Sequence, residues 1–134
     1  HGTLTGNIPM QSIEDRAMVC ECEEVSVGEV RYAVNQLYTG NLENLRRHTR
    51  MGMGTCQSEL CACRAANVLC RIAHLKPGKS ESDLFNFINE RWKGMYPVAW
   101  GETLKEGQLM SMIYEGLCGL DQLASSTTKK EDRK

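Results

Sequence analysis

Two close pairs of cysteines constrain this chain more than any other feature of its sequence. One residue separates Cys20 from Cys22, four separate Cys56 from Cys61, and 33 residues lie between the pairs. Two short pairs from separate segments can place four thiolates around a small metal core with little loss of chain entropy. We therefore expect the fold to bring the pairs together as one metal or cluster site.

The total of seven cysteines argues against a disulfide framework. An odd number cannot be fully paired within one chain, and residues 1–9 lack the charged and then apolar pattern of an export signal. Thiols stay reduced in the cytoplasm, where clustered cysteines usually serve metal or redox chemistry. We expect a cytoplasmic protein and, because residues 1–9 also lack an initiator Met, a piece of a longer chain.

Length and charge exclude several classes of protein. The 134 residues allow one domain with a small helical appendage, and 41% hydrophobic with 25% charged residues is typical of a globular protein. No apolar run approaches the roughly 20 residues that span a bilayer, so membrane attachment is expected only through a partner. The net charge of -1 lacks a basic surplus. We therefore expect no nucleic-acid partner, and disfavour a helix-turn-helix binder formed by residues 41–74.

Capping residues and apolar periodicity predict an all-α fold. Ser26 and Glu29 form a capping box that starts a first helix, and Asn41 is a candidate N-cap for a short second one. Ser80 and Asp83 resemble another capping box at the start of a fourth helix. No convincing strand pair is visible. Helices are also predicted at residues 58–74 and 102–120, the last with an apolar face of Leu104, Leu109, Met112, Ile113 and Leu117.

These patterns divide the chain into four segments. Residues 1–17 read as a linker or strap, and residues 18–78 as a helical domain that contains both cysteine pairs. Residues 79–122 form a C-terminal helical extension. Residues 123–134 are polar, lack an apolar anchor, and are expected to be a disordered tail.

The spacing within the pairs bears on which metal they would hold. Each pair is predicted to precede a helix, whose unpaired N–H groups and positive dipole end favour thiolates. Structural zinc sites commonly have two residues between paired cysteines. Spacings of one and four therefore favour an iron-sulfur cluster. A zinc-binding or metal-free module with a structural or docking role stays the alternative.

Three arginines precede the second pair, namely Arg46, Arg47 and Arg50. Positive charge near a cluster would raise its reduction potential, because it favours the more negative reduced state. A solvated helix face explains the same arginines equally well, and a phosphate or partner contact is a third explanation. Acidic residues gather instead in residues 14–29, around the first pair, while residues 45–76 are mainly basic.

Both cysteine pairs, and the glycine-containing loop before Cys56, lie in runs that resemble a known family. That family is the bacterioferritin-associated ferredoxin domain, and the later runs further resemble the C-terminal region of the A subunits of anaerobic glycerol-3-phosphate dehydrogenases. Together the resemblance covers about residues 18–120. The runs are residues 19–30, 45–47 and 49–61, followed by residues 89–94, 97–101 and 114–120.

The resemblance implies a small all-helical domain of the ferredoxin type that binds a 2Fe-2S cluster. The matching ligand positions are Cys20, Cys22, Cys56 and Cys61. The small ferredoxin has two residues between its last two cysteines, whereas this chain has four. Cys63 could therefore compete with Cys61, although a helix turns it by about 200 degrees to the other side, and Cys61 is preferred. The cysteines expected to be small buried apolar residues are Cys63, Cys70 and Cys118.

The resemblance also implies a function. This segment would be the electron-transfer domain of an FAD-dependent oxidoreductase that converts glycerol 3-phosphate to dihydroxyacetone phosphate. FAD and substrate would bind an upstream domain of the same parent chain, so no catalytic residue is assigned in this segment. Electrons would pass from flavin to cluster, then to other dehydrogenase subunits and quinone, at the inner face of the cytoplasmic membrane. The isolated protein can lose the cluster or hold zinc in its place.

Overall fold

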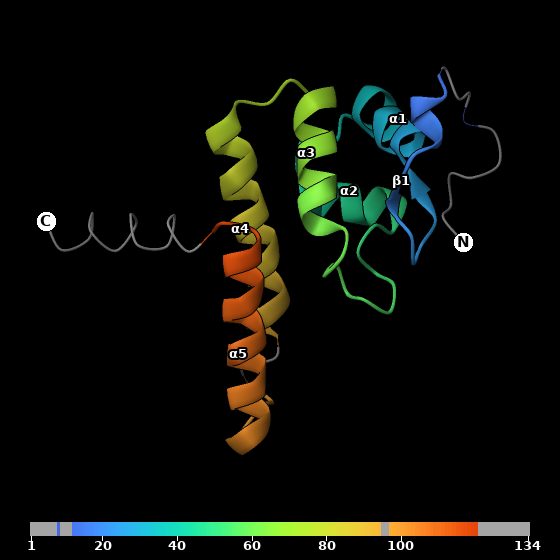
Figure 1. The fold of residues 1–134 in the computed structure, drawn as a ribbon. Coiled ribbons are helices and arrows are strands. Elements are labelled where there is room, and N and C mark those ends of the chain that lie inside the picture. Colours follow the sequence, from blue (N-terminus) through green and yellow to red (C-terminus); the bar gives the residue numbers. More distant parts are fainter. Residues whose placement is uncertain (1–7, 9–11, 95–96, 121–134) are drawn as a thin grey trace, which may run out of the picture. The chain divides into compact units, whose positions relative to one another are not determined.

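The computed structural model describes residue 8, residues 12–94 and residues 97–120 (Figure 1). The chain separates into two compact units, residues 1–84 and residues 85–134, and the division falls inside the fourth helix. The four segments predicted from the sequence stay a prediction, and the predicted tail, residues 123–134, lies outside the described residues.

The first unit begins with a 3-10 turn, η1 (Glu14–Arg16), and a short antiparallel hairpin of β1 (Met18–Cys20) and β2 (Val25–Ser26). Cys20 pairs with Val25, and an irregularity in β1 precedes that pair. Sequence reasoning missed this hairpin, because its strands are too short to show alternation. It places Cys22 in the turn between the strands.

Helix α1 (Val27–Leu37) begins where the sequence predicted. The Ser26 side chain accepts a hydrogen bond from the Glu29 N–H, and the Glu29 carboxylate accepts one from the Ser26 N–H. This capping box satisfies two N–H groups that the first helical turn cannot pair. Helix α2 (Leu42–Thr49) starts from Asn41, whose side chain accepts from the Asn44 N–H. Both predicted N-caps are confirmed.

Helix α3 (Ala62–Ile72) packs against α1, α2 and β1, and with them forms the core of the first unit. It is shorter than predicted, because residues 58–61 form turns that end at Cys61, the N-cap residue. Small side chains on α3 permit the close helix contacts, as Ala62 and Ala65 are fully buried. The fully buried large apolar side chains of this core include Val19, Val25, Val30, Leu42, Leu45 and Met51.

Helix α4 (Pro77–Lys93) starts earlier than the predicted capping box at Ser80 and Asp83. Proline suits the first turn of a helix because it has no N–H to leave unpaired. The Asp83 carboxylate instead accepts a hydrogen bond from the Leu42 N–H, 2.8 Å away, at the start of α2. The residues that suggested a cap thus lie inside the helix.

Helix α5 (Gly101–Leu117) lies in the second unit, and its predicted apolar face is wrong. The buried residues of α5 are Ser111 and Tyr114. Four of the five predicted face residues are exposed, namely Leu109, Met112, Ile113 and Leu117. The all-α fold class is nevertheless confirmed, with the small hairpin as an addition. Within the described residues, no helix combines the length and apolar character needed to cross a membrane.

Candidate metal centre

The first cysteine pair lies on the β1–β2 hairpin. Cys20 ends β1 with its side chain fully buried, whereas Cys22 in the following turn is exposed. Glu24 completes the turn with a φ of 54°. The pair therefore presents one sulfur to the interior and one to the surface. The pair precedes α1, as predicted, but the hairpin turn and β2 lie between Cys22 and the first residue of that helix, Val27.

The second pair lies on the loop that joins α2 to α3. Arg50 ends α2 in the left-handed region at a φ of 65°, and Gly52, Gln57 and Ser58 also have positive φ values. Ser58 Oγ donates to the Gly52 carbonyl at 3.2 Å, which closes the loop on itself. In Figure 1 this loop lies at the same end of the first unit as the hairpin turn.

Gly54 allows the two cysteine-bearing segments to touch. A Cβ atom placed on Gly54 would lie 2.4 Å from the Cβ of Cys22, a distance that side chains do not adopt. The neighbouring Thr55 donates its hydroxyl to Cys22 Sγ at 3.8 Å. The sequence showed a glycine-containing loop before Cys56. The structure shows that Gly54 lies against the other cysteine segment.

Hydrogen bonds lower the pKa of the Cys22 thiol. Donation from the backbone N–H of Cys56 is the largest cause that lowers the pKa of Cys22, followed by hydrogen bonds from the side chains of Cys56 and Thr55. A thiolate is the form that binds metals. The hairpin turn and the loop thus cooperate to prepare one sulfur as a ligand.

Cys61 has the opposite character. It is 2% exposed, caps α3 as the N-cap residue, and its Sγ lies 3.6 Å from the Met51 sulfur. Burial raises the pKa of Cys61 from near 9.0 to about 12, and negative charge on Cys20, Cys56 and Cys22 adds to the effect. At neutral pH the Cys61 thiol is therefore protonated. It would lose its proton when a bound cation compensates the negative charge of the thiolate.

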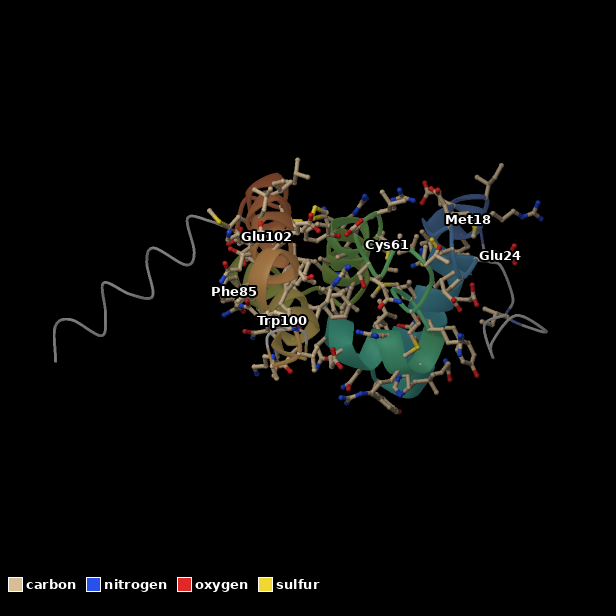
Figure 2. All side chains as sticks on the ribbon, turned by 90° about the horizontal axis from the view of Figure 1, so that it is seen from below. Met18, Glu24, Cys61, Phe85, Trp100 and Glu102 are labelled. Carbon is tan, nitrogen blue, oxygen red and sulfur yellow. The ribbon has the colours of Figure 1, made fainter. Side chains whose placement is uncertain are left out.

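The four predicted cysteines are thus neighbours in the folded chain. Hydrogen bonds join Cys22 to Cys56, and Cys61 interacts with all three others. In Figure 2, Cys61 lies on the side of α3 nearer to the hairpin segment that Met18 and Glu24 mark. Within the described residues, no group of three or more His, Cys, Asp or Glu side chains is arranged to hold a metal ion as it stands.

The other cysteines occupy different positions. Cys63 lies half-buried in the first turn of α3, and Cys70 lies further along the same helix, where its Sγ donates to the Leu75 carbonyl. Cys118 follows α5 in the second unit. The choice of Cys61 over Cys63 as the fourth ligand stays a prediction.

All-sulfur donors suit an iron-sulfur cluster, and hydrogen-bond donors of this chain can stabilise negative charge on a ligand sulfur. Ferredoxin-type clusters take four thiolates and are tuned by hydrogen bonds to the sulfurs. Thr55 and the Cys56 N–H already donate to a ligand candidate. The same four sulfurs also satisfy the donor requirement of zinc. The donor set therefore supports a thiolate metal centre without distinguishing the two.

Sequence reasoning missed two ion pairs around the first cysteine pair. Arg50 bonds Glu23 at 2.9 Å, and Arg64 bonds Glu21 at 3.1 Å. The uneven placement of charge, acidic near the first pair and basic near the second, was the signal that could have found them. Arg47 meanwhile pairs with Glu43 on its own helix. Two of the three arginines noted before the second pair therefore already have carboxylate partners.

Comparison with known families agrees with this arrangement. Residues 18–71 match the family of BFD-like 2Fe-2S binding domains. This BFD-like segment contains both cysteine pairs, both ion pairs, helices α1 and α2, and all but the last residue of α3. The resemblance predicted from the sequence is confirmed.

Curated relatives extend the likeness beyond the BFD-like segment. The chain is 53% identical, over 91% of its length, to the A subunit of the anaerobic glycerol-3-phosphate dehydrogenase of Escherichia coli K12. It is 32% identical, over 84% of its length, to the A1 subunit of that enzyme in Haloferax volcanii. A shorter match, 31% identical over 48% of the chain, is to the A subunit of the opine oxidase of Rhizobium meliloti. The chain spans 22%, 19% and 12% of these relatives. No solved structure matches it.

Proposed function

We propose that residues 18–78 hold a 2Fe-2S cluster on Cys20, Cys22, Cys56 and Cys61, and that this domain transfers electrons within a larger dehydrogenase. The observation that carries the proposal is the meeting of the hairpin turn with the loop at Gly54, which makes the two cysteine pairs neighbours. The match of residues 18–71 to 2Fe-2S binding domains supports the choice of cluster over zinc.

The relatives support a place for this domain in a redox chain. Their names describe parts of two kinds of oxidoreductase, a glycerol-3-phosphate dehydrogenase and an opine oxidase, which act on different substrates. A segment common to both is more suited to moving electrons than to recognising substrate. In the parent of this chain, electrons would pass from FAD in an upstream domain to the cluster, then to other subunits and quinone. Glycerol 3-phosphate would be oxidised to dihydroxyacetone phosphate at the flavin.

The chain's own residues would set the conditions for transfer. A bound 2Fe-2S cluster supplies one-electron redox chemistry. Thr55 and the Cys56 N–H would stabilise negative charge on the Cys22 sulfur. Cys20 and Cys61 are buried while Cys22 is exposed, so Cys22 marks the edge through which electrons would cross to a partner. We further propose a cytoplasmic location, with membrane association only through a partner subunit.

Anaerobic preparation of the full chain tests the cofactor. We expect brown protein with about two iron and two sulfide per chain, and an electron paramagnetic resonance signal on one-electron reduction. Serine at any of the four proposed ligands should lower the iron content or change the spectrum, whereas Cys70→Ser should change neither. Colourless protein that binds one zinc per chain and no iron after reconstitution would refute the cluster.

A pair of single variants tests the fourth ligand. If Cys61 is the ligand, Cys61→Ser shifts the visible spectrum and Cys63→Ser leaves it unchanged. The reverse result would assign Cys63, which lies in the first turn of α3. Electron transfer is tested separately in the complete dehydrogenase, where loss of the cluster should stop quinone reduction while substrate still reduces the flavin.

A further inference from the structure

Two ion pairs connect the hairpin turn to the segments that carry the second cysteine pair. Arg50 Nε lies 2.9 Å from Glu23 Oε2, and Arg64 Nη1 lies 3.1 Å from Glu21 Oε1. Glu21 and Glu23 are the two residues on either side of Cys22. We call Arg50–Glu23 and Arg64–Glu21 the bridging pairs.

Both arginines of the bridging pairs lie at fixed positions in the fold. Arg50 ends α2, and its N–H bonds the Arg46 carbonyl at 2.8 Å. Arg64 lies three residues after Cys61 on α3, and its Nη1 also donates to the Met18 carbonyl at 3.1 Å. One arginine therefore precedes the cysteine loop and the other follows it. Both reach across to the same hairpin.

Exposure distinguishes the two bridging pairs. The Glu23 side chain is 12% exposed, whereas the Glu21 side chain is 65% exposed. Ion pairs in contact with water contribute little because both charges are well solvated. Arg50–Glu23 is therefore the stronger connection, and Arg64–Glu21 depends more on its second bond to the Met18 carbonyl.

Each bridging pair joins a carboxylate next to Cys22 in the sequence to an arginine of opposite charge. A lone arginine would favour the more negative, reduced form of a bound cluster, and a lone glutamate would disfavour it. The effects of the two charges on the reduction potential nearly cancel. The sequence suggested that arginines alone would raise the reduction potential. In the structure, the carboxylate partner of each arginine in a bridging pair offsets that effect.

We propose that the bridging pairs position the Cys22 turn against the second cysteine segment, and that their charge balance sets the reduction potential of the centre. This inference rests on the proposed cluster for its redox part alone. The positioning part applies to the metal-free chain as well. The residues act through Cys22 and Cys20, so they are positioning residues rather than ligands.

The redox part is tested by potentiometric titration of the full chain carrying its cluster. Glu23→Gln should raise the midpoint potential, and Arg50→Gln should lower it. The double variant should lie between them, near the wild-type value, and Arg50→Lys should keep the wild-type potential because it keeps the charge. Glu43→Gln with Arg47→Gln is the matched control, an exposed pair within α2. Shifts of the same sign in both single variants would overturn the charge balance.

The positioning part is tested in reduced, metal-free protein by the alkylation rate of Cys20, which is fully buried in the hairpin. Opening of the turn exposes its sulfur. We expect the Glu23→Gln and Arg50→Gln double variant to react up to roughly fivefold faster, and the Glu43→Gln and Arg47→Gln control to react at the wild-type rate. Equal rates in all three proteins would refute positioning. Wild-type protein that binds no iron would refute the proposed cluster and leave this measurement intact.

Discussion

The two units of this chain use apolar residues in different ways. In the first, apolar side chains of α2 and α3 are buried, among them Leu42, Leu45 and Leu69, whereas Leu60 before α3 is exposed. In the second, Leu109 and Leu117 on α5 are exposed although periodicity selected them as a core face. Periodicity identifies a core face only where another element covers it. The first unit is thus a packed core around the cysteine site, whereas the large apolar side chains of α5 mostly face solvent.

Glycine shows the same contrast. Gly54 in the first unit has no room for a side chain, because Cys22 lies against it. A Cβ atom placed on Gly107 in α5 would have nothing within 4 Å. The close approach of two segments therefore requires glycine at position 54 of the first unit. At position 107 of the second unit a larger residue has room.

The largest effect is expected from Leu69→Ala. Leu69 is 1% exposed in the core of the first unit, and truncation leaves a cavity. The free energy of unfolding should fall by about 2–5 kcal/mol, measured by chemical denaturation followed by circular dichroism. Leu60→Ala is the matched control in the same unit, at a side chain that is 66% exposed. An equal loss in both variants would contradict the packed core described for this unit.

Alanine at the two glycines should act with opposite signs. Gly54→Ala forces Cys22 and the loop apart, which should lower the unfolding free energy by about 1–3 kcal/mol and reduce iron loading. Gly107→Ala should raise it by about 0.5–1 kcal/mol, because alanine favours a helix interior. Denaturation curves and iron analysis of the two variants check both signs. Normal iron loading in Gly54→Ala would show that the two cysteine segments tolerate separation.

Alkaline pH should destabilise the metal-free first unit through Cys61. Its folded pKa is raised to about 12 from near 9.0, so the unfolded chain loses this proton first as pH rises. Stability from this thiol is therefore constant below about pH 9 and is lost between pH 9 and 12. At pH 10 the loss is about 1 kcal/mol. Cys61→Ala should flatten this part of the stability profile, and an unchanged slope would place the titration elsewhere.

The sequence was most informative where local chemistry decides structure. Side-chain caps at Ser26 and Asn41 bond groups only three residues away, so their helices could be predicted without knowledge of the fold. Ser80 and Asp83 failed as a cap because Asp83 bonds the distant Leu42 N–H. A residue type that suits a local bond also suits a long-range one, and the sequence alone does not distinguish them.

The candidate site also has features that the sequence predicted and features that depend on the fold. Clustering of cysteines predicted which four sulfurs would become neighbours. The difference between exposed Cys22 and buried Cys61 was not predictable, because it depends on how the hairpin and the loop meet. The bridging pairs likewise join residues 27 and 43 positions apart in the chain. Complementary charge in two segments indicates that such pairs can form, but not which partners pair.

The smallest effect is expected from Met112→Gln on α5. Met112 is 69% exposed and both residues favour helices, so the unfolding free energy should change by less than about 0.5 kcal/mol. Tyr114→Ala is the matched comparison on the same helix, at a side chain that is 8% exposed, and should cost several times more. A loss of more than about 2 kcal/mol in Met112→Gln would mean that this apolar face is packed in solution. The predicted core face of α5 would then be restored, and the contrast between the two units would disappear.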